Sequence, residues 1–150
     1  MSKGSIEMLG RAGETIIANY CTSAGQKVVM SVDQYDSNKD MTVDGLMIEV
    51  KTQVPFVYKN AFTFRKNQLR KCTNADLVLF ISVPARDKPH HSYGKVYMIK
   101  SEKLQYSDYI TKDGREMILI PINQKDMEEF FILTKEECDI LQRYSTSAWN

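Results

Sequence analysis

Two carboxylates and a lysine in the segment DMTVDGLMIEVKTQ (40–53) have the types and spacing needed for chemistry on a phosphate. The segment contains Asp44-Gly45, a strong signal for a two-residue hairpin turn. Counting outward from this turn places Asp40 opposite Glu49, and directly opposed side chains in a hairpin lie about 5 Å apart. Because side chains alternate along a strand, Lys51 shares the face of Glu49.

Two like charges this close repel each other unless a third group neutralises them. Asp40 and Glu49 therefore predict a site for a divalent cation, with Mg²⁺ as the expected ion and Mn²⁺ as a substitute. Lys51 can orient or help deprotonate an attacking water, or offset charge that develops on a phosphate. The opposite face, which carries Leu46, Ile48 and Val50, is expected to point into the core.

Asp36 and Asp44 are the competitors of Asp40 for the first carboxylate position. Asp36 lies beyond the paired register, and Asp44 is used by the turn, so the register favours Asp40. Gln53 lies on the face of Glu49 and is a candidate to touch the phosphate or the water. The alternative for Gln53 is an ordinary polar residue at the end of a strand.

Positive charge is concentrated between residues 50 and 75. This stretch has six basic and no acidic residues, although the whole chain has a net charge of only +1. Such asymmetry favours an anionic partner, and the alternative is a solvated helix face. The candidate nucleic-acid-binding residues are Lys59, Arg65, Lys66, Gln68, Arg70 and Lys71.

The elements that must position these residues alternate between helices and strands. Apolar periodicity, turn signals and a capping box predict helices over 5–23, 64–72 and 134–144, and strands over 27–32, 77–83, 95–99 and 115–120 beside the 40–53 hairpin. Gly25 is the expected cap of the first helix. The run 77–83 is apolar throughout, which is typical of a strand covered on both faces. This order predicts one domain, 1–150, of the α/β (α+β) class with a mixed β-sheet flanked by helices.

Asp40 followed by Glu49-Val50-Lys51 at the end of a hairpin resembles the signature of the PD-(D/E)XK nuclease superfamily. Gly10-Arg-Ala-Gly-Glu14 resembles the first helix of small Holliday-junction-resolvase-like members, whose Glu reaches towards the metal. The resemblance covers roughly residues 10–83. Lys39 stands where the family often has Pro.

This resemblance implies a restriction-endonuclease-like core and a Mg²⁺-dependent endonuclease that hydrolyses DNA phosphodiester bonds at specific sites, in the manner of homing or restriction enzymes. Glu14 then joins the catalytic set of Asp40, Glu49, Lys51 and Gln53, or is a solvated helix residue, and Glu7 is its less well placed alternative. Cutting both strands of a duplex implies a homodimer or higher homo-oligomer. Two alternatives stay open: a resolvase acting on branched DNA, and a catalytically silent nucleic-acid-binding module.

Composition limits the remaining classes. A chain of 150 residues with 43% hydrophobic and 26% charged residues is typical of one globular domain. Three cysteines without a C-x-x-C pair fit a reducing compartment. Neither a signal peptide nor a membrane span is expected, so the predicted location is cytoplasmic.

Overall fold

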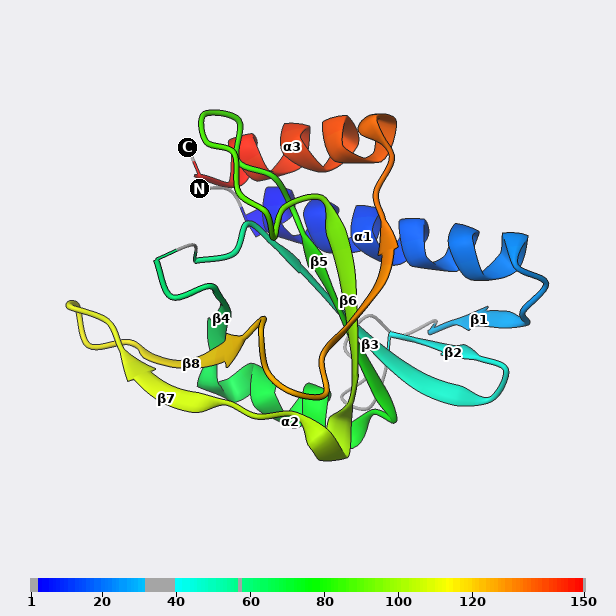
Figure 1. Ribbon diagram of the computed structural model, residues 1–150, viewed down its shortest axis with the longest axis horizontal. Coiled ribbons are helices and arrows are strands. Elements are labelled where there is room, and N and C mark those ends of the chain that lie inside the picture. Colours follow the sequence, from blue (N-terminus) through cyan, green and yellow to red (C-terminus); the bar gives the residue numbers. More distant parts are fainter. Residues whose placement is uncertain (1–2, 32–39, 57, 150) are drawn as a thin grey trace.

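The computed structural model describes residues 3–31, 40–56 and 58–149 (Figure 1). The helices and strands are, in chain order, α1 (Lys3–Ser23), β1 (Val28–Met30), β2 (Met41–Val43), β3 (Leu46–Gln53), β4 (Ala61–Arg65), the 3₁₀ turn η1 (Lys66–Gln68), α2 (Leu69–Asn74), β5 (Leu77–Ser82), β6 (Lys95–Lys100), the 3₁₀ turn η2 (Ser101–Lys103), β7 (Ser107–Ile110), β8 (Glu116–Pro121), β9 (Glu128–Ile132) and α3 (Lys135–Trp149).

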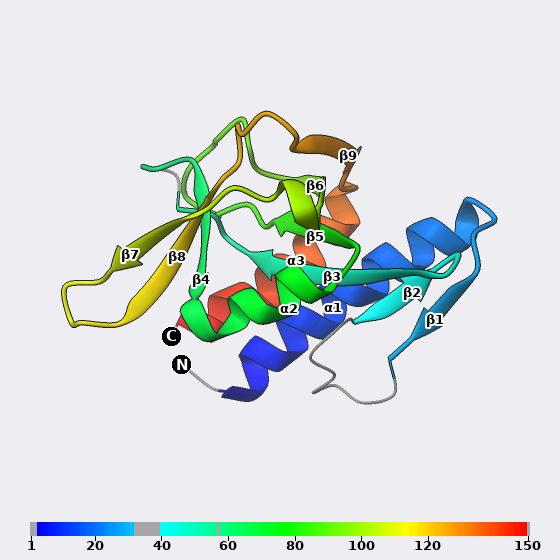
Figure 2. The ribbon, with the colours of Figure 1, turned by 90° about the horizontal axis from the view of Figure 1, so that it is seen from below.

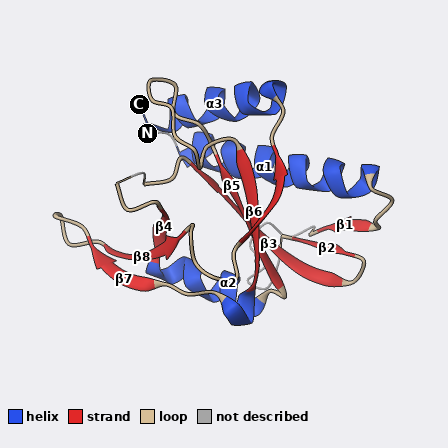
Figure 3. Ribbon diagram, viewed as in Figure 1, coloured by secondary structure: helices blue, strands red, loops and turns tan. Residues whose placement is uncertain are grey.

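The centre of the molecule is a six-stranded mixed sheet with the order β1-β2-β3-β5-β6-β9, in which β3 and β5 are parallel and the other neighbours antiparallel. Helices α1 and α3 lie together on one side of this sheet (Figures 1 and 3). On the other side lie α2 and a second sheet of three strands, β4-β8-β7. The predicted α+β class, a mixed sheet flanked by helices, is confirmed.

Strand β5 is covered on both faces, as its continuous apolar run predicts. Leu79 and Ile81 belong to a first core that includes α1 and α3. Val78 and Phe80 belong to a second core shared with the three-stranded sheet and α2. The six-stranded sheet is therefore packed between two apolar layers.

The 40–53 hairpin has the predicted register, with Val43 opposite Leu46 and Met41 opposite Ile48. Asp44 and Gly45 both have positive φ angles, 49° and 85°, as a tight two-residue hairpin turn requires. Ile48 and Val50 are buried in the first core as expected. Leu46 is 47% exposed, so its predicted place in the core is wrong: it adjoins the turn, where the sheet ends.

The C-terminal end of α1 and the N-terminal end of α3 have the caps that the sequence predicts. Gly25 has φ +85°, and the Gln26 N–H donates to the Cys21 carbonyl in the manner of a glycine C-cap. At the start of α3, the Thr134 and Glu137 side chains each accept a hydrogen bond from the other's backbone N–H (3.1 and 2.8 Å). Among the described helices, none is long and apolar enough to span a membrane.

The predicted helix over 64–72 is wrong at its start. Residues 61–65 form β4, and the α-helix begins only at Leu69, after η1. Phe64 pairs with Ile118 of β8, more than 50 residues later. Pairing with a distant strand overrides the local helical pattern, and no signal within the segment reveals it. The strands β7 and β9 were also not predicted.

Candidate active site

A close approach of α1 to β3 positions one wall of the candidate site. A Cβ atom on Gly13 would overlap with Thr52 Oγ1 and would lie 3.1 Å from Ile81 Cδ1. At Gly10, one turn earlier, a Cβ atom would meet nothing within 4 Å. Gly13 therefore lets the helix lie directly on the sheet, and Glu14, the next residue, is held beside the hairpin.

Asp40 completes the edge of β3 where pairing with β2 stops. Its backbone N–H donates to the Ile48 carbonyl, and its Oδ2 atom accepts a hydrogen bond from the Val50 N–H, both at 2.8 Å. The carboxylate thus takes the place of a strand partner and is fixed next to Glu49. The structure brings together the two carboxylates that the register places side by side. Asp36, the competing candidate, lies outside the described residues.

Glu49 is buried to an unusual degree for a carboxylate, with 1% of its surface exposed. Its Oε2 atom lies 3.1 Å from Lys51 Nζ, whereas Oε1 is buried and has no hydrogen-bond partner. Burial raises the pKa of Glu49 to about 7. The ammonium of Lys51 opposes this shift, and the charge of Asp40 adds to it.

Glu14 faces the same group of charges from the helix. Burial raises its pKa to about 7, and the carboxylate of Asp40 adds to the shift. Lys51 and Lys71 act in the opposite direction, as does Arg11. The charges of Asp40 and Lys51 therefore act on both Glu14 and Glu49.

Lys51 is held in place by Gln68. Its Nζ atom donates to Gln68 Oε1 at 3.1 Å and lies 5.4 Å from the centre of the Phe64 ring. Only 10% of the lysine side chain is exposed. Gln68 was predicted to contact nucleic acid; in the structure its amide oxygen positions the lysine, and this partnership between distant residues was not predicted from the sequence.

Gln53 joins the two sheets. Its Nε2 atom donates to the Thr63 carbonyl at 2.6 Å, and its Oε1 atom accepts from the Thr63 N–H at 2.8 Å. The amide side chain thereby pairs with the edge of β4 as a backbone strand would. A contact from Gln53 to phosphate or water stays a prediction, and both polar ends of this amide already have partners.

The predicted nucleic-acid-binding residues differ in their exposure and in their partners. Four of them are exposed: Lys59, Arg65, Lys66 and Arg70. Lys66 forms an ion pair with Asp108 at 3.5 Å. Lys71 is half-buried, and its charge reaches Glu14.

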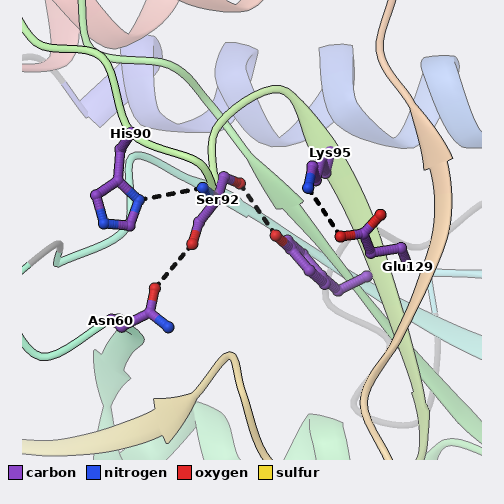
Figure 4. Close-up of polar contacts among 6 residues, drawn as sticks. Asn60, His90, Ser92, Lys95 and Glu129 are labelled. Carbon is purple, nitrogen blue, oxygen red and sulfur yellow. Dashed lines mark hydrogen bonds and ion pairs between the residues drawn. The ribbon is translucent and has the colours of Figure 1, made fainter.

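A second polar cluster surrounds Ser92, in the loop after β5 (Figure 4). His90 Nδ1 accepts a hydrogen bond from the Ser92 N–H at 3.1 Å, and Ser92 Oγ donates to Asn60 Oδ1 at 2.8 Å. Tyr97 donates to the Ser92 carbonyl at 3.2 Å. Because Ser92 is 1% exposed and its hydroxyl is engaged, the cluster joins this loop to the turn before β4 rather than presenting a nucleophile.

The carboxylate pair suits a hard cation. Asp40 and Glu49 supply oxygen ligands of the kind that Mg²⁺ prefers, and the unpartnered Glu49 Oε1 is one of them. In the described part of the chain, no group of three or more His, Cys, Asp or Glu side chains is arranged to hold a metal ion. A cation here would need further ligands from water or from a phosphate.

Comparisons of the chain with protein-family models, curated proteins and solved structures gave no match. The restriction-endonuclease-like core and the nuclease superfamily therefore stay predictions from the sequence.

Proposed function

We propose that the protein is a Mg²⁺-dependent endonuclease that hydrolyses DNA phosphodiester bonds. The observation that carries the proposal is the buried Glu49 carboxylate, with one oxygen unpartnered, beside a second carboxylate and an ammonium. Burying a charged group without full compensation is costly. A cation held by Asp40 and Glu49 would supply the missing counter-charge and a ligand bond for the free oxygen.

When bound, Mg²⁺ would stabilise negative charge on a phosphate oxygen as a Lewis acid. The residues of the chain have separate roles in the proposal. Lys51, fixed by Gln68, places positive charge where charge develops on the phosphate under attack. Glu14, with a pKa of about 7, accepts a proton from the attacking water near neutral pH.

Site-specific cleavage in the manner of homing or restriction enzymes is the preferred form of this activity, and it requires a homodimer or higher homo-oligomer to cut both strands. The resolvase alternative rests on the likeness of Gly10–Glu14 to the first helix of that group. A silent nucleic-acid-binding module is disfavoured, because phosphate binding does not need buried carboxylates. The three free cysteines support a reducing, cytoplasmic location.

The direct test is nicking, in Mg²⁺ or Mn²⁺, of supercoiled plasmid that carries a library of random-sequence inserts, because a site-specific enzyme cuts only DNA that contains its site. Lys51→Met removes the ammonium but keeps the apolar stem, and we expect the rate to fall by about 10²–10³. Lys95→Met is the matched control, because Lys95 also pairs with a glutamate, Glu129, at 2.8 Å but on another strand. Wild-type protein that leaves the plasmid intact, or equal rates for wild type and Lys51→Met, would refute the proposal.

Metal binding can be measured without turnover, by calorimetric titration with Mn²⁺. Glu49→Gln and Asp40→Asn should each weaken binding, whereas Glu129→Gln should leave it unchanged. If all three variants bind like the wild type, the cation is held elsewhere.

A further inference from the structure

The three-stranded sheet has one face that turns away from the second core, here called the outer face. In the register of this sheet, Thr63 stands opposite Leu119, which stands opposite Ser107, and the next row is Arg65, Met117 and Tyr109. All six side chains are exposed or half-buried. The alternate residues of the same strands include Phe62, Ile118 and Ile120, which are fully buried.

The alternation of side chains also separates the charges of this sheet. Asp108 stands opposite Ile118, and Glu116 stands opposite Ile110, so both acidic residues lie on the face that turns towards the second core. The outer face carries Arg65 and, among the residues of its three strands, no carboxylate. An anionic partner can approach this face without meeting an acidic side chain of these strands.

Aromatic side chains adjoin the outer face at Tyr109, and an exposed lysine is next to one of them in the chain. The Phe56 ring lies 6.4 Å from that of Tyr109 and 6.1 Å from that of Tyr58, measured between centroids. Tyr58 is 83% exposed, and the adjacent Lys59 is also exposed. Beyond β4, the strands β7 and β8 continue as a two-stranded ribbon that projects from the body of the molecule in both views (Figures 1 and 2).

We propose that the outer face reads the sequence of duplex DNA in the major groove; this inference rests on the proposed function, which makes DNA the substrate. The major groove, about 12 Å wide, admits a two-stranded β-ribbon. Strands β7 and β8 form such a ribbon, and Arg65, the last residue of β4, pairs with Met117 at its side. Arg65 has the donors that pair with the O6 and N7 atoms of guanine, and Met117 and Leu119 offer apolar contacts for thymine methyl groups. Specificity then comes from strands, in place of a separate recognition domain.

Two hydrogen bonds and a ring contact connect β4, which contributes to the outer face, with the strand that carries the candidate active site. Gln53, on the strand of Glu49 and Lys51, forms both of its amide hydrogen bonds with Thr63 of β4. Phe64, which precedes Arg65 in the chain and lies on the opposite face of β4, packs against the second core and lies against Lys51. A duplex bound to this face therefore has a fixed position relative to the carboxylates, as cleavage at a defined distance from a recognised sequence requires.

The test begins with selection of bound duplexes from a random library by the wild-type protein in Ca²⁺. Binding of the selected duplex and of a scrambled duplex is then measured by fluorescence anisotropy at one salt concentration. We expect Arg65→Lys to lower the preference for the selected duplex by about 5- to 150-fold while binding to the scrambled duplex is kept, because lysine retains the charge but not the bidentate donors. Tyr109→Ala should also lower the preference.

Arg86→Lys is the matched control, because Arg86 is an exposed arginine in the loop after β5. It should change the preference less than twofold. Thermal melting verifies that each variant is folded, and Arg65 is exposed, so Arg65→Lys is expected to melt like the wild type.

The inference is overturned if the library yields no preferred sequence, or if Arg65→Lys and Tyr109→Ala both keep the full preference. These outcomes are separate from those of the plasmid test. If the protein nicks plasmid with Mg²⁺ but Arg65→Lys keeps the full preference, the endonuclease proposal is supported and the outer face is not the surface that reads the sequence. Sequence-selective binding through Arg65 without any nicking would leave a DNA-binding module in place of the enzyme.

Discussion

The two faces of β3 use burial in opposite ways. Ile48 and Val50 lie in the first core, where burial of each apolar side chain stabilises the fold by about 1.5–3 kcal/mol. On the other face, Glu49 is more deeply buried than either of them and Lys51 is largely buried, but both side chains carry charges that water would solvate better. One face of β3 therefore stabilises the fold, and the other face destabilises it in part. Such a conflict within one element is typical of a functional site.

Substitutions on each face of β3 test most directly whether the two faces contribute differently to stability. Ile48→Ala should lower the free energy of unfolding by about 2–5 kcal/mol, because it leaves a cavity in the first core. The double variant Glu49→Leu/Lys51→Met should change it far less, because it removes both members of the buried ion pair, and apolar side chains of similar size in their place are often neutral or stabilising. Urea unfolding at pH 8 measures both. Equal losses in the two variants would mean that the charged face also stabilises the fold.

The second prediction concerns the contact of α1 with the apolar face of β3. Gly13→Ala forces a Cβ atom into Thr52 and should cost about 1–3 kcal/mol. Gly10→Ala meets open space and should stabilise the helix by about 0.5–1 kcal/mol. Thermal melting of the two variants compares a close contact with a free position on one helix.

The double variant Gly13→Ala/Thr52→Ala tests the cause of that loss. Thr52 Oγ1 is buried without a hydrogen-bond partner, so removal of this hydroxyl breaks no observed bond and relieves the overlap. The double variant should regain part of the lost stability. A loss that Thr52→Ala does not reduce would place the strain of Gly13→Ala elsewhere.

The smallest expected effect is the pH dependence of stability that Glu14 causes. Its pKa is about 7 in the folded protein and 4.5 ordinarily, so the folded state binds the proton more tightly. The stability that this proton contributes is complete below about pH 4.5 and is lost as the pH rises through 7. Glu14→Gln should therefore melt higher than the wild type at pH 8 and about equally at pH 4.5. Partial exposure screens the charge, which limits the difference to about 1 kcal/mol, or about 2–4 °C.

Glu7→Gln is the control for this measurement, because Glu7 is an exposed glutamate on the same helix. Its melting temperature should follow that of the wild type across the range. If the melting temperatures of Glu14→Gln and the wild type change with pH in the same way, Glu14 does not interact with Asp40 and Lys51 as proposed.

The sequence predicts those parts of the fold that local rules determine. The hairpin register follows from Asp44-Gly45 and alternation, and it places Asp40, Glu49 and Lys51 together before any tertiary contact is known. The second sheet could not be predicted, because β4 finds its partner more than 50 residues later. The local pattern at the end of β4 therefore predicts a helix instead of a strand.

The properties of the site depend on contacts that sequence spacing does not encode. The burial of Glu49, and hence its raised pKa, requires the layers that pack around β3. The bond from Lys51 to Gln68 and the pairing of Gln53 with Thr63 join residues whose separation has no regular period. The residue types of the site were predictable, but their protonation and their supporting partners were not.

The parallel pairing of β3 with β5 has a consequence for the rate of folding. A parallel neighbour cannot be reached by a tight turn, so the chain between Gln53 and Leu77 must cross over, and here it carries β4 into the other sheet. Long loops must close before such contacts stabilise the fold, so the pairing of β3 with β5 forms slowly. The hairpin that holds Asp40 and Glu49 closes over only a few residues and forms within about 1–10 μs. The two carboxylates thus meet early, in water, and become buried only when the slow crossover is complete.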